Sequence, residues 1–223
     1  MSAPPDPQRT HQLLQQLRQS YRSGRSLRES DLGPDWLTQL RAWIDEAVAA
    51  GILEPNAMVL ATTSADGRPN ARSVLLRGLD ERGLQFFSNY RSAKGRELAE
   101  NPRAALVFHW HGDPRRQVLV QGTVEKVSRE ESRAYFDSRE RGSRIAASIS
   151  RQSQPIESRQ ALEQEFAEAE ARLGDQVQLP DWWGGYVLAP ESFEFWESRP
   201  SRLHDRIRFT LEENGWKQGF LAP

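Results

Sequence analysis

Three side chains near the C-terminus of this 223-residue chain, Arg202, His204 and Arg206, follow one another at intervals of two residues. If the segment is extended, all three point to one face of a strand, because side chains alternate along a strand. Two cations and a titratable imidazole would then meet on one surface. The planar guanidinium of arginine suits flat, anionic or aromatic ligands. The segment is therefore a candidate for chemistry, and the alternative is a solvent-exposed edge strand with alternating charge.

A second group of polar side chains follows helical spacing. Tyr135 and Arg139 are four residues apart, so they share one helix face, and Ser143 would follow on the next turn. A phenol, a guanidinium and a hydroxyl on one face could bind a phosphate group. An exposed helix without a ligand is the alternative. Arginine or lysine also recurs beside hydroxyl groups in the segments 72–77 and 87–94.

The middle of the chain, which must position these groups, has the pattern of antiparallel strands. Short apolar runs alternate with turn signals, the clearest of which is Asn214-Gly215. Meandering strands with few long helices between them favour a barrel over a parallel doubly wound sheet. We expect strands over residues 57–64, 71–79, 84–89, 104–110 and 117–127, and a last set that opens at 182–186 and includes 192–196, 206–211 and 216–221.

Helical spacing of apolar residues predicts several helices around these strands. The strongest follows Gly33-Pro34 and ends at Gly51, and its apolar stripe is assigned to the core. The first nine residues are expected to be disordered, and residues 10–24 to form a weakly amphipathic, mobile helix. No linker is visible, so residues 1–223 are expected to form one domain. Further helices are expected over residues 92–101, 129–138, 143–149 and 158–173.

The composition excludes several classes of protein and site. The net charge is −1, so no global field favours nucleic acid or an anionic membrane. The absence of cysteine removes disulfides, thiolate catalysis and cysteine-ligated metals. No apolar segment is long enough to cross a bilayer and the first residues lack a signal-peptide core, so a cytoplasmic protein is expected. His109 and His111 could share a strand face, but no carboxylate is suitably spaced and no metal site is expected.

Several short motifs follow one another in an informative order. They are Arg72-Ser-Val-Leu-Leu-Arg77, Ser92-Ala-Lys94, Arg116-Gln117-Val118, Tyr135-Phe-x-Ser-Arg139, Gln152-Ser153, Trp183-Gly-Gly, Glu194-Phe-Trp196, Arg202-Leu-His-Asp-Arg206 and Leu221-Ala-Pro223. Together they resemble the pyridoxine (pyridoxamine) 5′-phosphate oxidase family, from about Arg18 to the last residue. The resemblance implies an α+β fold, mainly antiparallel: a split β-barrel with peripheral helices that binds flavin mononucleotide (FMN) as a homodimer. It also implies oxidation of pyridoxine 5′-phosphate or pyridoxamine 5′-phosphate to pyridoxal 5′-phosphate, with O2 as acceptor.

The resemblance implies a role for individual residues of this sequence. Arg202 and His204 would flank the pyridine ring as catalytic residues, and Arg18 and Tyr21 would act as a lid over the substrate. The substrate phosphate would be bound by Arg77, Tyr135, Arg139 and Ser143. The flavin would be held, with some residues from a second subunit, by Arg72, Ser73, Val74, Leu75, Leu76, Arg77, Phe87, Ser88, Lys94, Gln117, Gln152, Ser153, Trp196 and Arg206.

Three positions depart from the family pattern. Arg77 stands where lysine is common, which keeps the charge and changes the geometry of its donors. Ala93 and Phe220 stand where arginine is common, so a flavin-phosphate contact and any role of the second arginine are lost. Two other functions stay open: a non-catalytic flavin or vitamin B6 phosphate binding module on the same barrel, and a related flavoenzyme with another substrate.

Overall fold

The computed structural model describes residues 27–28, 31–174 and 176–223. The predicted disordered segment 1–9 and the predicted helix 10–24, with Arg18 and Tyr21, lie outside the described residues. No helix in the described part of the chain is long and apolar enough to cross a membrane.

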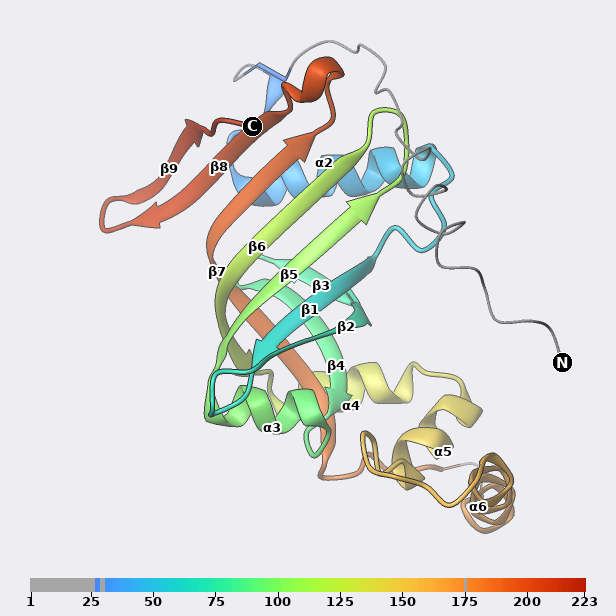
Figure 1. The fold of residues 1–223 in the computed structure, drawn as a ribbon. Coiled ribbons are helices and arrows are strands. Elements are labelled where there is room, and N and C mark those ends of the chain that lie inside the picture. Colours follow the sequence, from blue (N-terminus) through green and yellow to red (C-terminus); the bar gives the residue numbers. More distant parts are fainter. Residues whose placement is uncertain (1–26, 29–30, 175) are drawn as a thin grey trace, which may run out of the picture.

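The described strands form one curled, antiparallel sheet, which gives the half-barrel of Figure 1. Seven strands follow the order β2-β1-β5-β6-β7-β4-β3, while β8 pairs with β7 and β9 pairs with β8. The predicted class, mainly antiparallel β with peripheral helices, is confirmed. The strands are β1 (Ala57–Thr63), β2 (Pro69–Leu75), β3 (Gly78–Asp80), β4 (Gly83–Asn89), β5 (Arg103–Trp110), β6 (Arg116–Lys126), β7 (Trp183–Glu197), β8 (Asp205–Glu212) and β9 (Gly215–Phe220).

The longest strand, β7, joins the two ends of the molecule. It has 15 residues and pairs with β6 on one side. On its other side, residues 183–188 pair with β4, whereas residues 192–197 pair with β8. The register with β6 shifts between Gln121 and Gly122, which forms a bulge that bends the pair. A Cβ atom at Gly122 would lie 2.0 Å from the carbonyl oxygen of Ala189, so the bulge requires glycine.

Helix α2 (Trp36–Ala49) packs its apolar stripe into the main core, as predicted. Trp36 stacks on Phe193 with ring centres 4.5 Å apart, and Trp43 meets Phe195 edge-on at 5.2 Å. Both phenylalanines lie in the second half of β7. The helix therefore supports the end of the sheet at which β7 turns into β8.

Trp43 is 2% exposed, and its replacement tests this packing. Trp43→Ala is expected to lower the free energy of unfolding by about 3–5 kcal/mol, because a large buried ring is lost and a cavity remains. Leu53→Ala, at a side chain that is 91% exposed, is the control and is expected to change it by less than about 0.5 kcal/mol. Chemical denaturation at a fixed protein concentration measures both. A loss at Trp43 no larger than at Leu53 would contradict the described packing.

Four further helices gather at the opposite end of the sheet (Figure 1). A second apolar cluster, which includes Phe136, Ile145 and Trp183, joins three of them to the first half of β7. The predicted helices are confirmed, with ends that agree to within two residues. The helices are α3 (Ala93–Glu100), α4 (Arg129–Asp137), α5 (Arg141–Ile149) and α6 (Arg159–Arg172).

The structure divides the predicted strand 71–79 into β2 and β3. The backbone N–H of Leu76 donates to the carbonyl of Asn56, whereas that of Arg77 donates to the carbonyl of Gln85. The chain therefore changes partner between these two residues, from the β1 side to β4. A pattern of apolar residues reports which side chains are buried and not which strand they pair with, so it could not show this break. The reverse holds for the predicted segments 182–186 and 192–196. The sequence predicts them as separate strands, but the structure joins them in the single strand β7.

Candidate active site

A cavity of about 280 Å³ opens where strands β2 and β4 meet the start of helix α3 and the end of helix α4. It brings together residues that are far apart in the sequence. All but Trp183 belong to the predicted cofactor and substrate site. The cavity is lined by Ser73, Val74, Leu75, Arg77, Phe87, Ser88, Lys94, Tyr135, Arg139, Gln152 and Trp183.

Lys94 provides the positive charge at one end of this cavity. Its Nζ donates to Ser88 Oγ at 3.2 Å and to Gln152 Oε1 at 2.8 Å. Burial, and after it the charge of Arg72, lowers the pKa of Lys94 to about 8. A bound anion would favour the charged form of such a lysine. The residues at this end therefore fit a phosphate group.

Arg72 lies behind Lys94 and does not line the cavity. Its guanidinium forms a salt bridge of 2.9 Å with Glu97. Burial opposes the charge on Glu97, but hydrogen bonds from Thr62 and Asn70, together with Arg72, hold the pKa of this carboxyl below its usual value. Sequence reasoning missed Glu97, whose only signal is its place three residues after Lys94 on the same helix.

Two arginines and a tyrosine surround the other end of the cavity. The guanidinium of Arg77 lies 5.9 Å from the ring centre of Tyr135, and that of Arg139 lies 4.8 Å from Trp183. Phe87 stacks on Tyr135 at 3.9 Å and holds the ring in place. Nη1 of Arg139 is buried and has no hydrogen-bond partner in the part of the chain that the structure describes. Burial, and also the charge of Arg77, lowers the pKa of Arg139. An anion bound here would stabilise both guanidinium groups.

Besides Arg72, three predicted residues that are close in sequence to the lining residues do not line the cavity themselves. Leu76 is buried in the main core. Ser153 follows Gln152 in a left-handed backbone conformation, with φ of 71°. Ser143 lies in the first turn of α5, because α4 ends before Arg139 and a new helix begins two residues after it. Ser143 therefore does not follow Tyr135 and Arg139 on the next turn of one helix, as the spacing allowed.

The remaining predicted residues gather at the other end of β7. Gln117, Trp196 and Arg206 are cross-strand partners on β6, β7 and β8, so their side chains form one row on the same face. The ring of His204 lies 4.6 Å from that of Trp196. Arg206 forms a salt bridge of 2.7 Å with Glu194, which also binds Arg208. Glu194 therefore holds the Arg206 side chain in its place in this row.

Arg202 and His204 do not continue strand β8, so the extended arrangement considered for residues 202–206, with three side chains on one strand face, does not occur. Arg202 is exposed and ends the short 3-10 turn η2 (Pro200–Arg202). Ser201 and Arg202 both have left-handed backbones, with φ of 55° and 62°, and the chain reverses there before β8. Nδ1 of His204 accepts the backbone N–H of Arg199 at 3.0 Å.

One chain does not bring the two groups into a single cavity. Trp183, beside the cavity, begins β7, and Trp196 lies near the end of the same strand. An extended strand of this length spans at most roughly 50 Å. Figure 1 shows the loop between β7 and β8 at the end of the sheet opposite to α3 and α4.

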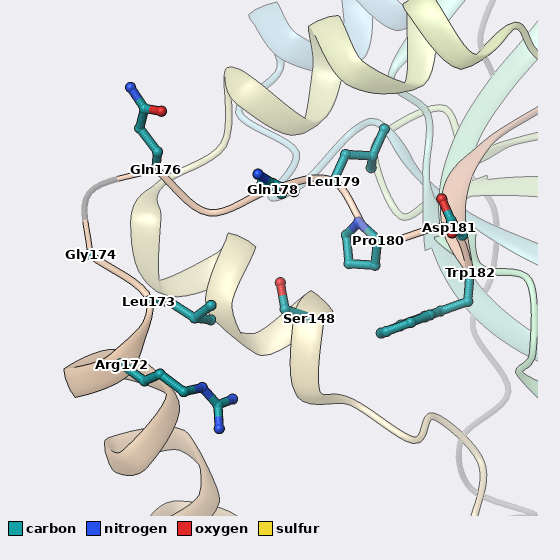
Figure 2. A pocket seen from close by; sticks show the side chains of 10 residues that line it. All are labelled: Ser148, Arg172, Leu173, Gly174, Gln176, Gln178, Leu179, Pro180, Asp181 and Trp182. Atoms are coloured by element: carbon teal, nitrogen blue, oxygen red, sulfur yellow. The ribbon is translucent and has the colours of Figure 1, made fainter.

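Another cavity, of about 910 Å³, lies between α5, the end of α6 and the segment that leads into β7 (Figure 2). None of its lining residues belongs to the predicted site. It is larger than the first cavity but lacks the paired cations. Its lining residues are Ser148, Arg172, Leu173, Gly174, Gln176, Gln178, Leu179, Pro180, Asp181 and Trp182.

His109 and His111, the pair considered for a metal, contact each other. Their ring centres are 4.2 Å apart. Burial, and after it the charges of His111 and Arg115, lowers the pKa of His109. Among the residues that the structure describes, no group of three or more potential metal ligands occurs.

Comparison with protein families and curated proteins gives consistent matches. Residues 44–172 match the family described as pyridoxamine 5′-phosphate oxidase. Residues 183–223 match the C-terminal dimerisation region of pyridoxine 5′-phosphate oxidase, which supports a homodimer. The pyridoxine/pyridoxamine 5′-phosphate oxidase of Cupriavidus necator is 53% identical over 211 residues, which cover 94% of this chain and 99% of the relative. That of Rubrobacter xylanophilus is 51% identical over 209 residues, covering 93% and 95%.

Two solved structures have a similar fold. PhzG from Burkholderia lata, solved in complex with tetrahydrophenazine-1-carboxylic acid, is 32% identical with a TM-score of 0.82, covering 87% of this chain and 95% of its own. A pyridoxamine 5′-phosphate oxidase-related, FMN-binding protein from Nostoc punctiforme is 20% identical with a TM-score of 0.69, covering 86% and 99%. The predicted split-barrel fold is confirmed. Because the sequence matches extend over nearly the whole chain, the protein belongs to the pyridoxine/pyridoxamine 5′-phosphate oxidase family of oxidoreductases.

Proposed function

We propose that this protein is an FMN-dependent oxidase that converts pyridoxine 5′-phosphate or pyridoxamine 5′-phosphate to pyridoxal 5′-phosphate, with O2 as acceptor. Membership of the family supports an oxidase, and its FMN-binding structural relative points to a flavin. One observation carries the substrate class: Nη1 of Arg139 is buried without a hydrogen-bond partner among the described residues, beside a second cation, Arg77. We also propose that residues 1–223 act as one domain in the cytoplasm.

The end of the cavity around Lys94 would hold the FMN phosphate. Ser88 and Gln152 already converge on Lys94 Nζ, and burial together with the charge of Arg72 lowers the pKa of this lysine, which a bound anion would raise again. Arg72, which is paired with Glu97 and does not line the cavity, would contribute its positive charge from behind Lys94. The chemistry that bound FMN supplies is acceptance of a hydride equivalent from the substrate carbon.

The other end would hold the substrate phosphate between Arg77, Tyr135 and Arg139. A phosphate monoester carries nearly two negative charges at neutral pH, so two such groups need local cations even in a chain whose net charge is −1. Arginine donors form short, charge-assisted hydrogen bonds with phosphate oxygens. Fixing the phosphate would fix the pyridine ring, whose orientation controls the rate of hydride transfer.

The site would be completed by a second copy of the chain. The dimerisation region, residues 183–223, contains Trp196, Arg202, His204 and Arg206, which lie far from the cavity of their own chain. A two-fold axis exchanges equivalent surfaces, so the loop of one subunit can reach the cavity of the other. Arg202 and His204 of the second subunit would then flank the pyridine ring.

Anaerobic spectroscopy tests the proposed reaction. The purified protein is expected to be yellow, to bleach when pyridoxine 5′-phosphate is added without oxygen, and to recover its colour in air. Pyridoxine without the phosphate is the control and is expected to reduce the flavin much more slowly, because it cannot use Arg77 and Arg139. A flavin that binds but stays oxidised with both phosphorylated substrates would favour the non-catalytic binding module. Faster reduction by a tricyclic carboxylic acid like the ligand of PhzG would favour another substrate.

The affinity for FMN is expected to fall as the pH rises through 8. Lys94 has a pKa of about 8 without a ligand, so it is charged below this pH and loses its charge above it. Because the anion binds the charged form, the dissociation constant of FMN should rise by up to about tenfold per pH unit above 8. Fluorescence titration of the FMN-free protein measures this. Lys94→Met should bind more weakly and lose the pH dependence, and an unchanged dependence in this variant would exclude Lys94 as its cause.

A further inference from the structure

We infer that Arg199 is a positioning residue, which closes the loop between β7 and β8 and thereby makes His204 a hydrogen-bond donor through Nε2. This rests on the proposed function, in which His204 contacts the substrate. The loop consists of residues 198–204 and carries both proposed ring-flanking residues. Ser201 and Arg202 have left-handed backbones, which residues with a Cβ atom rarely adopt, so the loop needs external contacts to keep its shape.

The two residues that close the loop are both acidic. Glu197 and Asp205 are directly opposite each other in the register of β7 and β8. Their side chains are only 4% and 20% exposed. Two like charges at opposed positions destabilise a strand pair, more so when they are shielded from water. A cation placed between the two carboxylates would remove this repulsion and stabilise the closed loop.

Arg199 supplies that cation from within the loop itself. Its side chain is 5% exposed, and Nη2 lies 2.7 Å from Glu197 Oε1. Its Nε donates to Asp205 Oδ2. A guanidinium can bind both carboxylates at once because its donors form a rigid fork, whereas an ammonium group is a single point charge. We call Glu197, Arg199 and Asp205 the loop clip.

Other contacts tie the loop clip to the rest of the fold. Arg116 of β6 binds the second oxygen of Glu197, with Nε 2.8 Å from Oε2. Asp205 Oδ2 also accepts the backbone N–H of Leu27 at 3.0 Å. At the start of the loop, the backbone N–H of Arg115 donates to Ser198 Oγ at 3.0 Å. The position of Arg199 is thus determined by β6, β8 and the segment before α2.

The same residue fixes the protonation pattern of His204. The backbone N–H of Arg199 donates to Nδ1 of His204 at 3.0 Å, so Nδ1 carries no proton. In a neutral imidazole the proton then sits on Nε2, which becomes a donor. Burial, and after it the charge of Arg202, lowers the pKa of His204 against the opposing effect of Asp205, which favours the neutral ring. His204 would therefore donate a hydrogen bond to the substrate and would not accept a proton from it.

Nitrogen NMR of the 15N-labelled holoenzyme tests this tautomer without using activity. The signals of His204 are assigned by their loss in His204→Gln. In the parent protein they are expected to show the Nε2–H tautomer. In Arg199→Gln they are expected to shift towards a mixture of tautomers, because the loop is no longer closed. Arg199→Lys should recover the parent pattern only in part. Arg103→Gln, which removes an exposed ion pair with Glu191, is the matched control and should leave the signals unchanged.

Kinetics add a second readout. Arg199→Gln is expected to lower kcat about 10- to 100-fold with little change in flavin content, because it misplaces a group that orients the ring. An Nδ1–H tautomer in the parent protein, or His204 signals that are identical in the parent, Arg199→Gln and Arg199→Lys, would overturn the inference. If the parent protein fails to reduce its flavin, the proposed function fails, while the NMR result still decides the role of Arg199.

Discussion

Arg139→Met is expected to lower kcat/KM for pyridoxine 5′-phosphate about 10- to 150-fold, mainly through a higher KM. A hydrogen bond to a charged group contributes about 1.5–3 kcal/mol, and this range corresponds to that fold-change. The flavin should remain bound, because Lys94, Ser88 and Gln152 hold the other end of the cavity. Steady-state kinetics and the visible spectrum of the purified variant measure both effects.

The same substitution separates a binding role of Arg139 from a structural one. In the protein without substrate, Nη1 of Arg139 has no hydrogen-bond partner among the described residues, so its removal leaves no described acceptor unsatisfied. The melting temperature of the substrate-free variant should therefore change little. Arg133→Met, at an exposed position on the preceding helix α4 that does not line the cavity, is the matched control. Equal kinetics in the two variants would remove Arg139 from the substrate site.

The sequence predicted the fold well because burial patterns are local. The apolar stripe of α2 and the alternation in β5 and β6 depend on the period of the element and not on its partner. The break at Leu76 and the continuity of β7 depend on which strands pair, and a chain carries no local signal of its partners. The errors in the strands therefore lie where strands change partner.

The site shows the same division between local and distant information. Motif order placed ten of the residues around the cavity, because a family resemblance carries three-dimensional information that spacing alone lacks. Helical spacing allowed Ser143 to follow Arg139 on the next turn, and strand alternation allowed Arg202 and Arg206 to share a face, but the break between α4 and α5 and a 3-10 turn prevent both. Glu97 was missed because its partner Arg72 is distant in sequence, and Arg199 was missed because it lies in a loop, where side chains follow no periodic pattern.

Mixing two defective variants is expected to restore activity at a substrate concentration well below KM, because each proposed site combines two subunits. Arg202→Leu should slow flavin reduction at least about 100-fold by misorienting the ring, and Arg139→Met weakens substrate binding at the cavity. In a mixed dimer, one site would contain both substitutions. The other site would contain neither, because the unchanged Arg139 of one subunit would meet the unchanged Arg202 of its partner. Random reassociation makes half of the dimers mixed, so about a quarter of the parent activity should return. Rapid-quench measurement of flavin reduction after co-refolding gives this fraction.

The quarter recovery distinguishes the two possible arrangements of the site. If Arg139 and Arg202 of the same chain served one site, every site in a mixed dimer would keep one defect, and no mixture could exceed the activity of the single variants. The separation of Trp183 and Trp196 along β7 argues against that arrangement within one chain. Co-refolding Arg139→Met with Arg77→Met is the matched control, because both residues line the same cavity. Recovery in the first mixture and none in the second would place the loop of one subunit over the cavity of the other.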